Sequence, residues 1–289
     1  MNKDWIRQES NPNGSKSLSP FPYPGGKGRK SKWIIDRIPP HDTFVEAFGG
    51  SGAITYNKPP SKYEIYNDVN DDLVQFFRIL RTRPDELIDF LNTVPYSRSL
   101  YEQWVTEHYS GYRPDDPIRR AGRFFALRYM QISGEMTKRN GFKTRASRSP
   151  ARSFSNGVKQ LDEIANRFSE VIIENQDYAD LFSNYDDTSV DVLFYCDIPY
   201  IGTEHVYGRM FNQEAFVEAI SEIDSEWMVS CDEVPKGLDD LGYVQKRNRR
   251  HRMNRSEGEV VERLVCSFDP SSTSNFVSSQ TEQTRIGDV

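Results

Sequence analysis

The sequence predicts an α/β fold in which helices cover both faces of a sheet. Short apolar runs alternate with helical patterns through most of the chain, as in repeated strand–helix units. The run VDVLFYCD (190–197) is nearly all apolar, which is typical of a strand buried inside a parallel sheet. The length of 289 residues allows one large domain, or a domain with an insertion.

Each element is predicted from its own pattern. In DDLVQFFRILR (71–81), apolar residues at 73, 74, 76, 77 and 80 fall on one helical face. Pro84 stands near the start of the following helix, where proline is tolerated. The predicted helices are 71–81, 83–94 and 212–223; the predicted strands are 43–48, 62–68, 171–177, 190–197 and 227–232, followed by an antiparallel pair in GYVQKR and EVVERLVCSF.

Residues 96–155 interrupt this alternation and are predicted to be an insertion. They contain helical pieces such as DPIRRAGRFFALRYMQIS, followed by a stretch rich in glycine, serine and arginine. Residues 19–95 and 156–270 then form the main domain. The polar ends, 1–18 and 271–289, are predicted to be a disordered and a flexible tail.

Composition excludes several classes of protein. Mean hydropathy is −0.71, and no apolar run approaches the roughly 20 residues that cross a bilayer. The first ten residues lack the apolar stretch of a signal peptide, so cytoplasmic location is the default expectation. Cys196, Cys231 and Cys266 each end an apolar run, which predicts buried strand residues rather than a disulfide framework or a metal site.

The charge is unevenly distributed. Net charge is −6, yet residues 113–152 hold eleven basic residues against three acidic ones. A second stretch, KRNRRHRMNR (246–255), holds six lysines or arginines and no acid. Two basic patches in an acidic chain favour local binding of a polyanion, although solvated charged faces would give the same pattern.

Polar residues gather where the predicted strands end. VEAFGGSGA (45–53) runs from a strand into Gly49, Gly50 and Gly52, and the following strands end in Asp68, Asp177 and Asp197. FYCDIPY (194–200) on its own could be an ordinary β-turn after a strand, or a site made of a carboxylate, fixed carbonyls and an aromatic face. In an open α/β sheet the carboxyl ends of parallel strands share one edge, where ligands bind. Four strand ends of this kind favour the site.

Together these segments resemble the Dam-type N6-adenine DNA methyltransferases of the D12 class. The resemblance spans about residues 20–268 and rests on the order of its motifs, since each motif alone is weak. The motifs are PYPGGK (22–27), FVEAFGGSGA (44–53), YNDVN (66–70), NQDYADLF (175–182), YCDIPYIGT (195–203) and the closing MNRSEGEVVERLVCSF (253–268). The resemblance implies a Rossmann-like S-adenosylmethionine-dependent methyltransferase sheet, with a mainly helical target-recognition insertion at 96–155.

The resemblance also implies a cofactor site for S-adenosylmethionine. Phe48, Gly50 and Gly52 would lie under its methionine part, and Lys27 with Tyr23 and the PGG turn would close over it. Asp68 would bind the ribose, and Asp177 with the Tyr178 backbone would bind the cofactor's adenine. For Lys27, a solvated surface lysine is the competing interpretation.

The same resemblance assigns catalysis to Asp197, Ile198, Pro199 and Tyr200. The Asp197 carboxylate and the Ile198 carbonyl would accept hydrogen bonds from the exocyclic amino group of a flipped-out adenine, and Tyr200 would stack on the base. Direct transfer of the methyl group would follow, without a covalent enzyme intermediate. The family's usual residue at 198 is proline. Isoleucine keeps the carbonyl but loses the ring's rigidity, so activity could be reduced.

The basic insertion is the predicted contact with double-stranded DNA. Most of its arginines are expected at phosphates, and some at guanine edges. The candidates are Arg128, Lys138, Arg139, Asn140, Lys143 and Arg145. GEMTKRNGF stands where GATC-specific relatives have a motif like FNVPFG, so the resemblance does not extend to GATC specificity, and the recognition sequence stays open.

Two alternative functions stay open from the sequence. They are a methyltransferase acting on RNA or a protein amide, and a catalytically impaired relative that only binds DNA. Restriction–modification is a setting in which such enzymes work, but no residue pattern identifies a nuclease partner.

Overall fold

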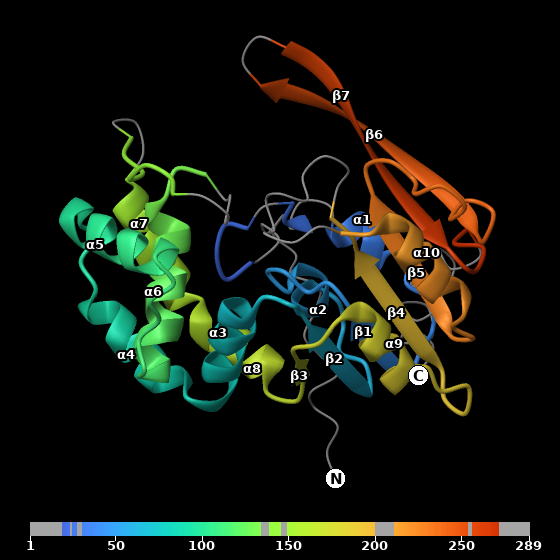
Figure 1. Cartoon of the computed structure of the whole chain (residues 1–289), viewed down its shortest axis with the longest axis horizontal. Coiled ribbons are helices and arrows are strands. Elements are labelled where there is room, and N and C mark those ends of the chain that lie inside the picture. Colours follow the sequence, from blue (N-terminus) through green and yellow to red (C-terminus); the bar gives the residue numbers. More distant parts are fainter. Residues whose placement is uncertain are drawn as a thin grey trace, which may run out of the picture.

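A computed structural model of the chain describes residues 19–23, 25–27, 31–133, 139–145, 149–199, 211–253 and 256–271. A seven-stranded sheet forms one part of the molecule, and a group of helices lies beside it (Figure 1). The prediction of an α/β fold is confirmed.

The sheet has the strand order β3-β2-β1-β4-β5-β7-β6. The five strands from β3 to β5 are parallel, and β7 runs antiparallel to both β5 and β6. The order reverses between β1 and β4, which makes that position the switch point of the sheet. The strands are β1 (Thr43–Glu46), β2 (Tyr63–Asn67), β3 (Ile172–Glu174), β4 (Val192–Asp197), β5 (Glu226–Cys231), β6 (Tyr243–Met253) and β7 (Ser256–Cys266).

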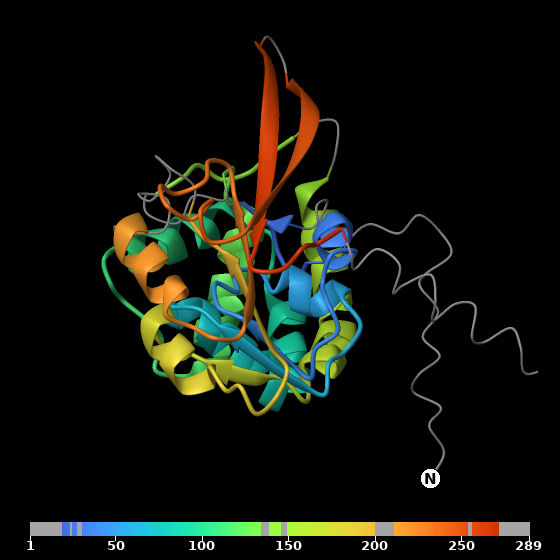
Figure 2. The same cartoon turned by 90° about the vertical axis from the view of Figure 1, so that its right-hand side faces the viewer.

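Every strand predicted from the sequence is present, but the closing hairpin is longer than expected. The strands β6 and β7 each have eleven residues, and they pair along their whole length. The far end of this hairpin extends beyond the body of the molecule (Figures 1 and 2). The predicted strand GYVQKR ended at Arg247, whereas β6 continues through the basic residues up to Met253.

Helices cover both faces of the sheet. On one face, α1 (Ser31–Ile35) and α2 (Ala53–Asn57) pack on an apolar cluster that includes Phe44 and Leu193. On the other, α9 (Tyr178–Tyr185) and α10 (Gln213–Ser221) pack on one that includes Val45 and Phe194. Adjacent strand residues thus belong to opposite clusters, as the pleat of a two-sided sheet requires.

The chain between β2 and β3 is helical. One apolar cluster runs through all of its helices, so the residues of the predicted insertion share a core with the helices before and after it. Asn70 caps α3 and Asp116 caps α6, each accepting hydrogen bonds from the first turn, which fixes where these helices begin. The helices are α3 (Asp71–Thr82), α4 (Pro84–Thr93), α5 (Arg98–Tyr109), α6 (Pro117–Met130), α7 (Pro150–Lys159) and α8 (Leu161–Phe168).

Ion pairs tie α6 to α3 and α5. Arg113 and Arg120 both reach Asp72, at 2.6 and 2.7 Å, and Arg123 reaches Glu107 at 2.5 Å. Burial alone would raise the pKa of Asp72, but Arg120 and Arg113 lower it. Three of the eleven basic residues counted in 113–152 are therefore paired with acids of other helices.

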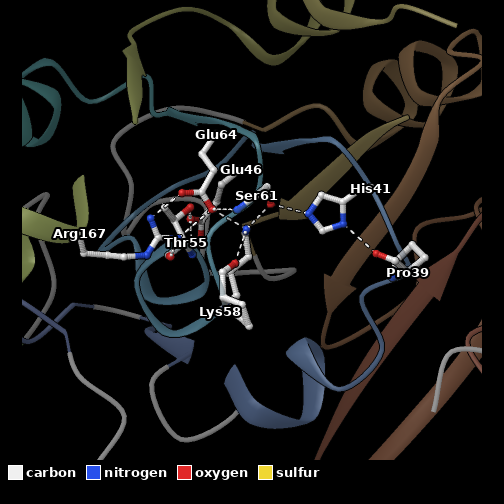
Figure 3. Close-up of polar contacts among 9 residues, drawn as sticks. Pro39, His41, Glu46, Thr55, Lys58, Ser61, Glu64 and Arg167 are labelled. Carbon is white, nitrogen blue, oxygen red and sulfur yellow. Dashed lines mark hydrogen bonds and ion pairs between the residues drawn. The ribbon is translucent and has the colours of Figure 1, made fainter. Parts of the chain in front are cut away.

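A buried polar cluster joins α2, α8 and the first half of β2 (Figure 3). Lys58 donates to Glu64 at 2.5 Å, and Arg167 of α8 holds the same carboxylate from the other side. Burial lowers the pKa of Lys58 to about 8. Glu64 stands near the amino end of β2, so its pairs with Lys58 and Arg167 support the fold away from the carboxyl ends of the parallel strands.

The structure bears on three of the predicted absences. Within the described ranges, no helix is long and apolar enough to cross a membrane. Among those same residues, no group of three or more His, Cys, Asp or Glu side chains is arranged to hold a metal ion. The three cysteines are buried and free.

Candidate functional site

The carboxyl ends of β1, β2 and β4 meet at the switch point of the sheet. Glu46 of β1 pairs with Tyr66 of β2 on one side and with Tyr195 of β4 on the other. The amide of Asn67 donates to the carbonyls of Ala47, at 2.9 Å, and Gln176, at 3.1 Å, which links the ends of three strands. The predicted convergence of the strand ends is present in the structure.

The glycine turn after β1 is held from both sides. Gly50 has φ of +52°, and its N–H donates to the Asp68 carboxylate at 2.9 Å. The Tyr66 hydroxyl donates to the Gly50 carbonyl at 2.6 Å. A side chain at Gly50 would lie 2.9 Å from the Tyr23 ring, so glycine lets that ring pack on the turn. Burial raises the pKa of Asp68, against the hydrogen bonds it accepts from the Asn70 and Gly50 amides.

We expect Gly52→Ala to lower the free energy of unfolding by about 1–3 kcal/mol, because it combines backbone strain with a clash. Gly52 has φ of +67°, and an added Cβ would lie 2.8 Å from the buried Phe168 ring. Gly111→Ala is the control, since Gly111 has φ of +90° but no atom within 4 Å of the added Cβ. Urea unfolding should show the larger loss at Gly52, and equal losses would contradict the clash.

Asp197 ends β4 and is bonded by two side chains. The Lys27 ammonium lies 2.8 Å from its Oδ1 atom, and the Ser230 hydroxyl donates to the same oxygen at 3.0 Å. Lys27 also lies 2.6 Å from the Glu262 carboxylate. Its side chain is only 2% exposed, whereas that of Asp197 is 22% exposed. The interpretation of Lys27 as a solvated surface lysine is therefore wrong.

The residues after Asp197 are described up to Pro199. The Ile198 side chain is buried at 3% exposure in the apolar cluster under α9 and α10. Pro199 is half-buried, and Tyr200 lies outside the described residues. Packing around Ile198 thus constrains the position at which the resemblance expects a proline.

Aromatic rings line the neighbouring strand ends. The Phe48 ring stacks on that of Tyr178, with centroids 5.7 Å apart, and Phe211 packs on its edge at 5.8 Å. Phe211 also lines a hollow of about 500 Å³. Asp177 caps α9 by accepting from the Ala179 amide at 3.1 Å, so it stands at a helix start rather than at the last residue of a strand.

The predicted DNA contacts fall into two groups. Arg128 is 1% exposed, with its guanidinium 5.2 Å from the Phe124 ring centroid. A direct contact between Arg128 and DNA is not possible in this conformation, and that prediction is corrected. Arg139 and Arg145 are exposed, Asn140 and Lys143 are half-buried, and Lys138 lies outside the described residues. Arg139 forms an ion pair with Glu102 of α5.

Sequence reasoning missed two residues of this site. Ser230 is buried in β5 beside Asp197, and nothing in WMVSC distinguishes it from an ordinary strand serine. Glu262 did carry a signal. In EVVERLVC it alternates with Leu264 and Cys266, both buried, so the strand period places an acid on an inward-facing position.

Residues 23–234 match the family model of the D12 class N6 adenine-specific DNA methyltransferases, which covers more than half of the chain. The chain belongs to this family. The recognition made from the motifs is confirmed, and the sheet is that of a methyltransferase family member.

The curated relatives that match this chain are named DNA adenine methylases. The DNA adenine methylases of Escherichia coli strain K12 and Salmonella typhimurium strain LT2 are each 29% identical over 187 residues. Both matches cover 62% of this chain and 63% of the relative, so the chain matches less than two thirds of the relatives' length. A Clostridium thermocellum structure, provisionally described as an rRNA-methylase, covers 83% of this chain and 94% of that one at 11% identity. Its TM-score of 0.33 is too low to carry an argument.

Proposed function

We propose that this protein methylates the N6 atom of adenine in double-stranded DNA, with S-adenosylmethionine as the methyl donor. The observation that carries the proposal is the placement of Asp197. This carboxylate lies at the switch point of a sheet of the methyltransferase family, bonded by Lys27 and Ser230 and partly open to solvent.

Asp197 and Ile198 would bind the target amino group. The Asp197 carboxylate and the Ile198 carbonyl would accept hydrogen bonds from its two N–H groups, which orients the nitrogen lone pair and excludes competing water. The buried Ile198 side chain supports this role, because packing restrains the carbonyl in place of a proline ring. Pro199 would continue the turn, and Tyr200 would stack on the flipped base.

The residues of the glycine turn fit the cofactor. Tyr23, Gly50 and Gly52 shape the turn, and each Asp68 oxygen has a lone pair left to accept a ribose hydroxyl. The stacked rings of Phe48 and Tyr178 offer an apolar wall for an adenine ring, with Asp177 exposed beside them. The cofactor would supply an electrophilic methyl group. Lys27 would then act on Asp197 rather than as a lid over the cofactor.

Two basic segments would hold the DNA. The segment that follows α6 in the sequence carries Lys138, Arg139, Asn140, Lys143 and Arg145, of which Arg139 and Arg145 are exposed, and β6 carries the basic residues of 246–253. Both segments rise on the same side of the molecule, toward which β4 points (Figure 1). A duplex on that side would meet phosphate contacts from both segments, with the strand ends between them.

This function assigns a role to each part of the chain. Residues 19–95 and 156–270 would form the catalytic domain, and 96–155 the target-recognition insertion. The ion pairs of Arg113 and Arg120 with Asp72 of α3 would hold that insertion in a fixed position against the catalytic domain.

The test is methyl transfer from tritiated S-adenosylmethionine to unmethylated duplex DNA. We expect label in N6-methyladenine, lost by at least about a thousandfold in Asp197→Asn, because the variant cannot accept both its protein donors and the amino group. Asp187→Asn, at an exposed carboxylate before β4, should retain full activity. Mapping the modified adenines would give the recognition sequence.

Two outcomes would count against this function. Label in RNA or protein but not in DNA would indicate a different substrate class. Binding of both DNA and cofactor without any transfer would indicate a relative that only binds DNA.

A further inference from the structure

Glu262 is a buried acid outside the segment that matches the family model. It stands on β7 at 3% exposure, whereas the match ends at residue 234. Its place in the sheet is set by register. Asp197 pairs with Ser230, Ser230 pairs with Leu264, and Glu262 is two residues from Leu264 on the same face. The hairpin therefore brings a second carboxylate to the strand ends.

Glu262 and Asp197 share one ammonium. Lys27 lies 2.6 Å from Glu262 and 2.8 Å from Asp197, and both Lys27 and Glu262 are almost fully buried. Burying a charge costs free energy unless it is paired, so Lys27 needs a carboxylate at this position. One carboxylate would be enough for that, as Lys58 and Glu64 show elsewhere in the fold.

The second carboxylate changes what Lys27 can do at Asp197. Lys27 and Ser230 both bond Oδ1, and no described residue donates to Oδ2. Both bonds thus hold the Oδ1 atom, and the Asp197 side chain keeps an exposure of 22%. Without Glu262, the whole positive charge of Lys27 would fall on Asp197 and weaken it as an acceptor.

We propose that Glu262 is a positioning residue of the methyl-transfer site: it holds the Lys27 ammonium, which fixes the Asp197 carboxylate for the target amino group. This rests on the proposed function. Glu262 would touch neither the base nor the cofactor, and would act only through Lys27. The closing hairpin would thereby be part of the catalytic site.

The Lys27 charge also acts on Tyr195 and Cys231. Burial raises the pKa of Tyr195 far above its usual value and that of Cys231 to about 12, so both stay neutral near pH 8. Arg247 is opposite Glu262 in the register, and its guanidinium lies over Trp33, 5.8 Å from the ring centroid. Asp197 and Glu262 bond the Lys27 ammonium directly, while Glu46 acts on Asp197 and Tyr195, and Arg263 acts on Cys231.

The experiment compares Glu262→Gln with Glu64→Gln, which breaks the other buried lysine–glutamate pair. We expect kcat of Glu262→Gln to fall about tenfold to a hundredfold, with DNA and cofactor affinity nearly unchanged. The basic limb of its kcat–pH profile should move down by about one pH unit or more, because Lys27 loses one of its two anions. Glu64→Gln should lose stability while keeping the profile.

Lysine labelled with ¹³C at Cε supplies a readout that needs no methyl transfer. The Lys27 resonance, assigned by its loss in Lys27→Arg, should titrate at lower pH in Glu262→Gln than in the wild type. If Glu262→Gln does not fold, Glu262→Asp is the second variant, because it keeps the negative charge on a shorter side chain. Its kcat should fall by less than tenfold, since the shorter carboxylate still holds Lys27 in part.

Three results would overturn the proposal. They are a kcat of Glu262→Gln within twofold of wild type, an unchanged Lys27 titration, and a loss no different from that of Glu64→Gln. A wild-type protein without methyl transfer would instead refute the proposed function. The Lys27 titration separates these cases, because it reports the link to Glu262 whether or not the protein transfers methyl groups.

Discussion

Lys27→Met is expected to lower the free energy of unfolding by about 3–5 kcal/mol at pH 8, because it leaves the buried Glu262 and the partly exposed Asp197 without their shared cation. Asp197 and Glu262 both bond the Lys27 ammonium, so its removal turns two attractions into one repulsion. Lowering the pH lets one of the carboxylates bind a proton. The loss should therefore be smaller at pH 5 than at pH 8.

Urea unfolding at both pH values measures this effect. Lys32→Met is the matched control, since Lys32 is an exposed lysine of the same segment that pairs with Asp36 at 3.0 Å. Such a surface pair contributes about 0–1 kcal/mol. The double variant Lys27→Met/Glu262→Gln should recover part of the stability, as it removes the repulsion. A loss at Lys27 no larger than that at Lys32 would mean that the ammonium does not bridge the carboxylates.

The sequence predicts the strand ends of this fold well, for a physical reason. A buried parallel strand must be apolar throughout, so the polar residues that follow it mark its end sharply. Asp68 and Asp197 were located in this way, and the glycine turn at Gly50 follows from the same logic. Both carboxylates lie at the edge where the parallel register brings the strands together.

Charge on a helix is harder to interpret from sequence. Arg113, Arg120 and Arg123 look like a DNA-binding surface when they are counted along the chain. Their acidic partners, among them Asp72 and Glu107, come from other helices, so no local pattern shows that the charges are already paired. Tertiary contacts decide which arginines stay available for phosphates.

Distance along the chain likewise explains why no sequence motif assigns Glu262 to the site. Its partner Lys27 lies 235 positions away, and the strand that carries it could be read as an edge hairpin with one solvated face. In the structure, Glu262 on that face bonds Lys27 at the site. Asp197 thus depends on segments from both ends of the described chain, in addition to the motif in which it stands.

Glu46→Gln is expected to stabilise the protein relative to wild type by an amount that grows with pH. Glu46 ends β1 and accepts hydrogen bonds from the Thr55 amide, at 3.1 Å, and hydroxyl (Figure 3). Burial raises its pKa from 4.5 to about 7, and the nearby Asp197 charge adds to the shift. The folded protein therefore keeps a proton on Glu46 that the unfolded chain releases between pH 4.5 and 7.

The sign of the effect follows from this difference in bound protons. Glu46 favours the folded state fully below pH 4.5, and that advantage is lost as the pH rises through 7. At 1.36 kcal/mol per pH unit, the difference between Glu46→Gln and wild type should grow by about 3 kcal/mol over this range. Glutamine does not titrate, and the pH dependence that all other groups contribute is shared by both proteins. It therefore cancels in the difference between their free energies of unfolding.

Urea unfolding of both proteins at pH 4.5, 5.5, 6.5 and 7.5 measures the growth of this difference. Repeating the series with Asp197→Asn in both proteins tests its cause, because removing the Asp197 charge should make the growth smaller. A difference that stays constant with pH would show that Glu46 titrates alike in the folded and unfolded states. A dependence that survives unchanged without the Asp197 charge would show that burial alone raises the pKa of Glu46. In that second case, the carboxylate at the end of β1 and the one at the end of β4 would be electrostatically independent, although they lie on adjacent strands.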